Sequence, residues 1–156
     1  MTAKLFKSAS AICFVIFGWS VAPAATPAPS LQRPAVEKRF EELEWRRAEA
    51  ETLGVLRQQL MATTIQIVSR DPNGPLAQSA KNDVKESTVT WCTKESTWKR
   101  DFQNLEAELK KANGGDLPAW VMRDRNWQTL DQGMKKSTVK VKPEQCRPVV
   151  EQTLKD

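Results

Sequence analysis

The longest helical pattern in the chain runs from Pro34 to Ser69. This stretch contains one glycine, Gly54, and no proline after its first residue. Its apolar side chains recur at spacings built from threes and fours, as in an amphipathic helix. They are Val36, Phe40, Leu43, Ala50, Leu53, Leu60 and Ile67. About 35 helical residues span ~50 Å, so the sequence predicts either a helix that protrudes from a small domain or one that breaks near Gly54.

A turn and a second helix are predicted next. The stretch RDPNGP, residues 70–75, contains two prolines and an Asn-Gly pair, which favour a turn. Apolar residues then follow a heptad pattern through Val84, Trp91, Trp98 and Leu105, and through Phe102 and Leu109. The β-branched residues of STVTWCT, 87–93, suit a strand nearly as well. We predict helix here because the apolar stripe continues through the segment.

A third helical segment covers residues 119–136, with Trp120, Trp127, Leu130 and Met134 on one face. If it folds back on the second helix about Gly114 and Gly115, residues equidistant from the bend meet. Leu109 is then expected near Trp120, Phe102 near Trp127, and Trp98 near Leu130 or Met134. The predicted fold is therefore mainly α: a small helical bundle built on a long N-terminal helix and a helical hairpin.

Two cysteines follow the N-terminal region, Cys92 and Cys146. The hairpin count places Cys92 near residue 138, and residues 137–142 alternate valine with polar residues as in a short extended segment. A tail returning through this segment brings Cys146 toward Cys92, so we predict a structural disulfide that clasps the C-terminal tail. A redox-active thiol is the alternative, although the chain has no CxxC motif. A last short helix is expected to begin at Pro148.

The N-terminus has the three parts of a secretory signal peptide. Lys4 and Lys7 precede an uncharged run over residues 9–22, and Ala22-Pro23-Ala24 offers a small-residue cleavage site. We therefore expect a signal peptide at 1–24, a proline-rich linker at 25–34, and one helical domain at 35–156. The predicted location is periplasmic or secreted, with no stable membrane span after cleavage. A retained signal anchor is the competing interpretation, although the apolar run is shorter than the roughly 20 residues that a span needs.

Composition argues against several classes of function. The chain has no histidine, which removes His-based nucleophile systems and His-ligated zinc, and it has no glycine-rich phosphate loop. Basic and acidic residues are interleaved, which is unlike a nucleic-acid footprint. Glu106, Asp124 and Asp131 could pair for glycoside hydrolysis, but each also suits an exposed helical face. We predict a non-enzyme that uses no metal or cofactor and does not bind nucleic acid.

The remaining candidates for function are surface residues. Trp45 lies off the apolar stripe of its helix, so it is expected either to be exposed for a partner or to pack against the returning tail. The tryptophans between 91 and 127 suit a binding groove or, at helical spacing, a core. Arg123 and Arg125 form a basic loop candidate. We expect a binding, adaptor or structural protein of the cell envelope that contacts another envelope or exported protein. An immunity- or inhibitor-type protein that blocks an exported toxin or hydrolase is the alternative.

Overall fold

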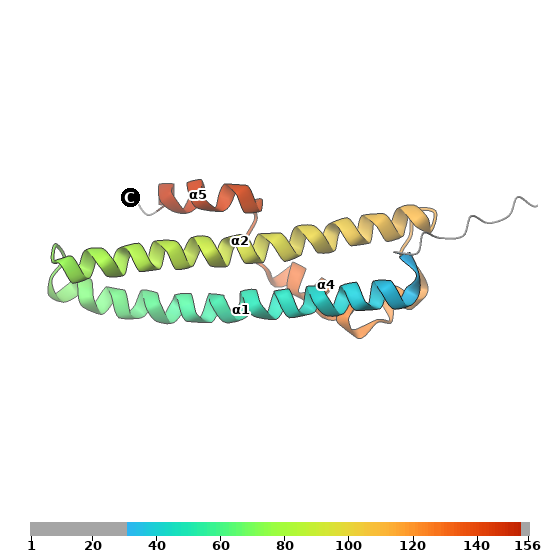
Figure 1. Cartoon of the computed structure of the whole chain (residues 1–156), viewed down its shortest axis with the longest axis horizontal. Helices are drawn as coiled ribbons and strands as arrows, with labels where there is room; N and C mark the ends of the chain where they lie inside the picture. The colour runs from blue at the N-terminus through green and yellow to red at the C-terminus, as the bar shows by residue number, and fades with distance from the viewer. Residues whose placement is uncertain (1–30, 154–156) are drawn as a thin grey trace, which may run out of the picture.

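Two long antiparallel helices form the frame of the molecule, which was described by a computed structural model over residues 31–153 (Figure 1). Helix α1 (Arg33–Arg70) and helix α2 (Pro75–Ala112) have 38 residues each. Shorter helices follow: α3 (Ala119–Met122), α4 (Arg125–Lys136), the 3-10 helix η2 (Pro143–Gln145) and α5 (Cys146–Thr153). No strand occurs within the described residues. The predicted mainly helical bundle with a long N-terminal helix is confirmed.

Local sequence explains where the two long helices begin and end. Each has a proline in its first turn, where the missing N–H is not needed. The turn over residues 71–74 separates them, and the Gly74 N–H donates to the Asp71 carbonyl oxygen. Helix α1 is continuous through Gly54, and residues 87–93 are helical. The structure therefore has the long helix without the break that Gly54 suggested.

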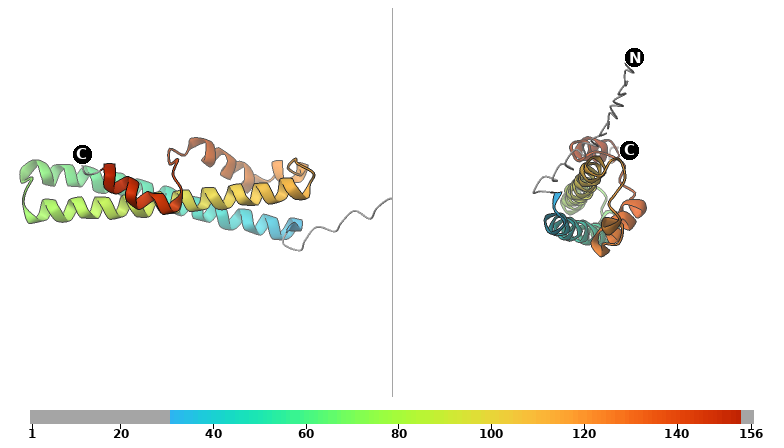
Figure 2. Two further views of the ribbon diagram at one scale, coloured as in Figure 1. Left: turned by 90° about the horizontal axis from the view of Figure 1, so that it is seen from above. Right: turned by 90° about the vertical axis from the view of Figure 1, so that its right-hand side faces the viewer.

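The helical hairpin is made by a different pair of helices from the one expected. Helix α2 lies along α1, and α4 packs mainly on α1 at one side of that pair (Figure 2). The chain breaks at Arg123 and Asp124 between α3 and α4, which carries α4 away from a simple return along α2. Some of the side-chain neighbours predicted between α2 and the segment 119–136 are nevertheless close in the structure. The Trp127 indole N–H donates to Glu106, one turn from Phe102, at 3.1 Å.

The main core lies in the half of the hairpin that α4 covers. Phe40 and Phe102 form its centre, with ring centroids 6.5 Å apart. Both helices and the short C-terminal elements contribute buried side chains. These are Val36, Phe40, Leu43, Ala50, Trp98, Phe102, Leu105, Leu109, Val121 and Leu130. Large apolar side chains are thus concentrated where three helices meet, as the hydrophobic effect requires of a small domain.

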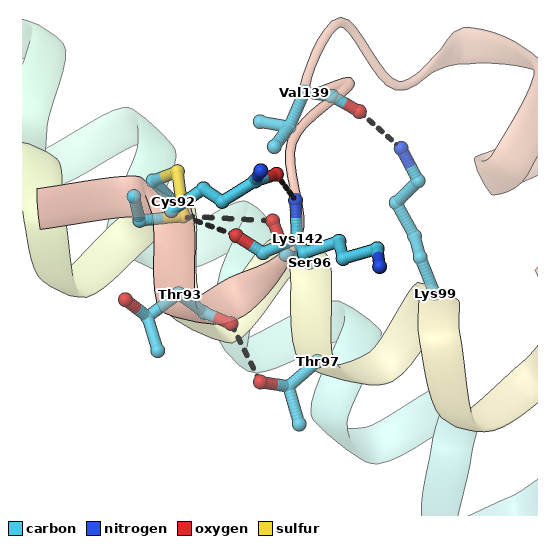
Figure 3. The surroundings of a disulfide bond; sticks show 9 residues. Cys92, Thr93, Ser96, Thr97, Lys99, Val139 and Lys142 are labelled. Atoms are coloured by element: carbon cyan, nitrogen blue, oxygen red, sulfur yellow. Dashed lines mark hydrogen bonds between the residues drawn. A yellow bond between two sulfur atoms is a disulfide. The ribbon is translucent and has the colours of Figure 1, made fainter. Parts of the chain in front are cut away.

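A second, smaller cluster fixes the C-terminal tail to α2. Cys92 and Cys146 are joined by the predicted disulfide, with Cα atoms 5.7 Å apart, and both are buried beside Val139 (Figure 3). Residues 137–142 have no repetitive structure, and the Lys99 ammonium group donates to the Val139 carbonyl oxygen. Helix α5 begins at Cys146, two residues before the expected start at Pro148. It lies on α2 on the side away from α1 (Figure 1).

The N-terminal predictions fall largely outside the described residues. This holds for the signal peptide at 1–24 and for most of the linker at 25–34, although Arg33 and Pro34 already belong to α1. Across residues 31–153, none of the helices combines the length and the apolar character needed to cross a membrane.

Candidate interaction surface

The charge on α1 changes abruptly along its length. Residues 33–51 contain eleven charged side chains, whereas residues 52–69 contain only Arg57. This second half of α1 pairs with the first half of α2. We call this part of the hairpin the arm and define it as residues 52–70 and 75–91. The sequence contains this signal as a run almost without charge over residues 52–69, which apolar periodicity by itself does not reveal.

Ion pairs between α1 and α2 stop where the arm begins. In the other half of the hairpin three pairs join the two helices: Arg39 with Glu108 at 2.8 Å, Arg46 with Asp101 at 3.1 Å, and Lys94 with Glu49 at 2.9 Å. Among the described residues of the arm, no ion pair links α1 to α2. Two polar contacts join the helices there: the Thr64 hydroxyl donates to the Ala80 carbonyl oxygen at 3.5 Å, and Arg57 contacts α2. Its guanidinium lies 4.8 Å from the centre of the Trp91 ring and donates to Thr88 at 2.9 Å.

Large apolar side chains are exposed on the arm. Val55, Leu56, Ile65 and Leu76 are 51%, 54%, 67% and 65% exposed, and they are four of the seven exposed large apolar residues in the described part of the chain. The side chains buried between the helices are smaller. They are Thr64, Ala77, Ala80 and Val84. Val55 and Ile65 lie on one side of α1 and Leu56 on the other, because nine residues, or two and a half turns, separate Leu56 from Ile65. Charge is scarce on the α1 part of the arm only, since the α2 part carries Lys81, Asp83, Lys85 and Glu86. Large apolar groups exposed on a helix with few charges are typical of a protein interaction site.

A hollow lies at the tip of the arm, beside the turn. It has a volume of about 540 Å³ and is formed by both helices. Its walls are Thr63, Gln66, Ile67, Arg70, Asp71, Pro75, Leu76 and Ala77. Leu56, Leu60, Thr63 and Ile67 follow one another at spacings of four, three and four, so they lie along one side of α1 and lead into this hollow. The hollow therefore ends an apolar groove along the pair.

No third helix covers this groove. Helix α4 ends at Lys136, beside the middle of α1, and α5 lies on the outer side of α2 (Figure 1). A second hollow of about 300 Å³ opens beside the C-terminal end of α4, between Gly54, Trp91 and Lys136. Val55 also lines this second hollow, and Ile65 follows on the same side of α1, opposite the groove. The layer that α4 provides in the other half of the molecule ends before it reaches these two residues, which remain exposed.

Trp45 is 68% exposed, so it does not pack against the returning tail. It lies eleven residues, or three turns, before Leu56, with Thr52 between them, which places all three on one side of α1. The exposed indole therefore extends the apolar surface of the arm toward the charged half of the helix.

Arg123 and Arg125 are exposed at the junction of α3 and α4. Asp124 between them caps α4, because its carboxylate accepts the Trp127 backbone N–H at 2.9 Å. In the described part of the chain, neither arginine takes part in an ion pair with a protein carboxylate. The structure does not combine these arginines with Trp45 into one site, since α4 packs on α1 whereas Trp45 projects into solvent.

Each of the other tryptophans between 91 and 127 has a structural contact. Trp98 is buried and donates to Glu95 at 2.8 Å, and Trp120 lies under the Arg33 guanidinium at 5.5 Å. Trp127 donates to Glu106. These contacts favour packing over a common aromatic groove.

Each of the three carboxylates considered for hydrolysis also has a structural contact. Glu106 accepts the Trp127 indole N–H, Asp124 caps α4, and Asp131 forms an ion pair with Lys135 at 2.5 Å. Residues 31–153 contain no cluster of three or more side chains suited to hold a metal ion.

Comparison of the chain with protein-family models, with curated proteins and with solved structures gives no match.

Proposed function

We propose that the protein is an exported, non-catalytic binding or adaptor protein of the cell envelope, whose arm docks an amphipathic helix of another exported protein. The observation that carries this proposal is the arm itself: a pair of helices with exposed Val55, Leu56, Ile65 and Leu76 and almost no charge on α1. The central part of a protein interface is depleted in charged residues, and exposed apolar patches on small proteins usually mark such sites.

A helical occupant is favoured because the protein already binds one helix in the equivalent position. Helix α4 packs on α1 in the other half of the hairpin and buries Leu130 there. Val55 and Ile65 lie on this same side of α1 beyond the end of α4, so a partner helix placed over them would continue that layer. An amphipathic helix laid into an apolar groove is a common mode of recognition.

Export is supported by two features. The leader over residues 1–24 has the signal-peptide pattern, and the Cys92–Cys146 disulfide suits an oxidising compartment such as the periplasm. The partner is then expected among envelope or exported proteins.

The test is site-specific photo-crosslinking of the full chain in its native host. A crosslinking amino acid is placed at Val55 or Ile65 in the arm and, as the matched control, at Ala48, which is exposed on α1 outside the arm. The expected result is one partner that crosslinks from 55 and 65 but not from 48, through a peptide of helical amphipathic pattern. Equal crosslinking from all three positions would contradict the proposal, and so would a product made only of two copies of this chain.

A variant pair gives the same test a quantitative form. Val55→Glu with Ile65→Glu puts charge on the side of α1 beyond the end of α4, at exposed positions, and is expected to abolish capture of the crosslinked partner. Ala48→Glu adds the same charge to α1 outside the arm and is expected to leave capture unchanged. Circular dichroism of both variants checks that the helices remain folded. Retained capture by the folded double variant would refute the arm as the docking surface.

An immunity- or inhibitor-type protein is the second candidate. Its support is the pair of exposed arginines at 123 and 125, which have no ion pair in the described residues and flank an aspartate already used as a helix cap. Two such cations suit an acidic cleft on an exported enzyme. Loss of partner capture in Arg123→Gln with Arg125→Gln, but not in the arm variant, would favour this function.

A further inference from the structure

A third hollow in the molecule lies between α2 and the tail segment that follows α4. We call it the basic cleft and define it by Lys99 and Arg100 of α2, Lys140 and Lys142 of the tail, and the apolar Met134 and Val141. Its volume is about 540 Å³, within the range of ligand sites, roughly 300 to 1,000 Å³. It lies away from the arm, next to the disulfide that holds the tail (Figure 3).

The cleft carries positive charge that the protein does not neutralise. Four basic residues line it against one acidic residue, Glu144. Arg100 pairs with Asp101 at 3.0 Å. The three lysines are absent from the ion pairs of residues 31–153. The Coulomb energy of such like charges is lowered when an anion binds between them.

Two of these lysines are held by neutral oxygen atoms instead. The Lys99 ammonium donates to the Val139 carbonyl oxygen (Figure 3). It also donates to the Ser137 hydroxyl at 3.1 Å, and Lys140 donates to the Ser137 carbonyl oxygen at 3.2 Å. Partial burial, and to a smaller extent the charge of Lys140, lowers the pKa of Lys99, although Glu95 opposes this. These bonds tie the two walls together and fix the positions of the charges before any ligand arrives.

Apolar side chains make up the rest of the lining. Met134, Val139, Val141 and Pro143 all face the cleft, and Val139 and Val141 pack in the cluster around the disulfide. Their position is therefore fixed by a covalent bond between the tail and α2. A small inorganic anion would leave this apolar lining in water, whereas a ligand with an apolar part would cover it.

We propose that the basic cleft binds an amphiphilic anion, a carboxylate or phosphate group carried on an apolar chain. The anionic group lies among the ammonium groups of Lys99, Lys140 and Lys142, and the apolar chain lies against Met134 and Val141. A free amphiphile and the headgroup region of an anionic lipid present this same chemistry. The site is separate from the arm, so it does not depend on the function proposed for the arm.

The test uses octyl phosphate below its critical micelle concentration as the probe, with inorganic phosphate and octyl glucoside as comparisons, measured by calorimetry on the full mature chain. Octyl phosphate is expected to bind at least about tenfold more tightly than either comparison. It alone has both a phosphate group for the basic side chains and an alkyl chain for the apolar side chains of the cleft. In an NMR titration the methyl signals of Val139, Val141 and Met134 are expected to shift. Vesicles of phosphatidylglycerol against phosphatidylcholine distinguish the lipid source from the free amphiphile.

Variants locate the site. Lys140→Gln and Lys142→Gln are each expected to weaken octyl phosphate binding by about tenfold, the loss of one charge-assisted hydrogen bond. Lys110→Gln removes the same charge from an exposed position of α2 outside the cleft and is expected to have no effect. Equal weakening by all three variants, binding of inorganic phosphate as tight as that of octyl phosphate, or absence of binding to both octyl phosphate and phosphatidylglycerol vesicles would each overturn the proposal.

Discussion

Arg57 of α1 and Trp91 of α2 form a cation–π contact, with the guanidinium carbon 4.8 Å from the ring centroid, at the boundary between the core and the arm. Gly54 lies one turn before Arg57 and against the same indole. A Cβ atom at Gly54 would lie 2.9 Å from Trp91 Nε1. The absence of a side chain at Gly54 is what lets the tryptophan pack flat against α1 at this point.

Gly54→Ala is therefore expected to destabilise the protein. Alanine gains about 1 kcal/mol over glycine in a helix interior, but displacement of a packed indole costs about 1 to 3 kcal/mol, so the net loss is about 1 kcal/mol. Urea unfolding measures it. In a Trp91→Leu background the obstruction is removed, and the same Gly54→Ala change is expected to stabilise by about 0.5 to 1 kcal/mol. Stabilisation in both backgrounds would show that the contact does not constrain Gly54.

The arm is expected to open more readily than the rest of the hairpin. It buries small side chains such as Thr64, Ala77 and Ala80, whereas the other half buries Phe40, Trp98 and Phe102. Local unfolding free energy follows the apolar area buried. Native-state hydrogen exchange should therefore be faster for amides in residues 56–84 than for amides in residues 36–50 and 98–109. Uniform protection along both helices would contradict this expectation.

Reduction of the Cys92–Cys146 disulfide is expected to destabilise the fold. The bond closes a loop of 55 residues, counted from 92 to 146. Removal of a native disulfide from a small exported domain typically costs about 2 to 5 kcal/mol, and Cys146→Ser should cost a similar amount in urea unfolding. Native protein should show no reactive thiol at Cys92 or Cys146. Alkylation of both cysteines in native protein with an unchanged melting temperature would exclude the clasp.

The Arg147–Glu86 pair should make stability depend on acid pH. Two bonds join their side chains, at 2.8 and 3.0 Å, and hydrogen bonding to Arg147 lowers the pKa of Glu86 from its ordinary value of 4.5. A depressed folded-state pKa gives stability that is present above pH 4.5 and is lost as pH falls through the lowered value. Carboxyl NMR should report a Glu86 pKa below 4.5, which returns to the ordinary value in Arg147→Gln. Because the pair is exposed, its effect on the melting temperature should be small.

Sequence periodicity was sufficient to predict the helices themselves. The stripe from Val36 to Ile67, the turn at 70–75 and the heptad through Trp91 and Trp98 each correspond to an observed element. Helical periodicity depends on local backbone geometry, which neighbouring residues determine. The disulfide was also predictable, because the two cysteines that follow the predicted leader allow a single pairing.

The choice of partner for each helix was decided by the tertiary structure. An apolar stripe shows which side of a helix is buried but not against what, so the stripe of α2 suited α4 as well as α1. Helices α1 and α2 have equal lengths of 38 residues and can lie together over their full extent, whereas α4 has only 12 residues. Burial along α1 shows the consequence. Leu60 and Ile67 belong to the same stripe as Phe40 but are only half-buried, because the facing part of α2 buries small side chains, Ala77 and Ala80, and α4 packs on the other side of α1. Periodicity gave all three the same expected burial, and only the tertiary packing separates the core from the exposed arm.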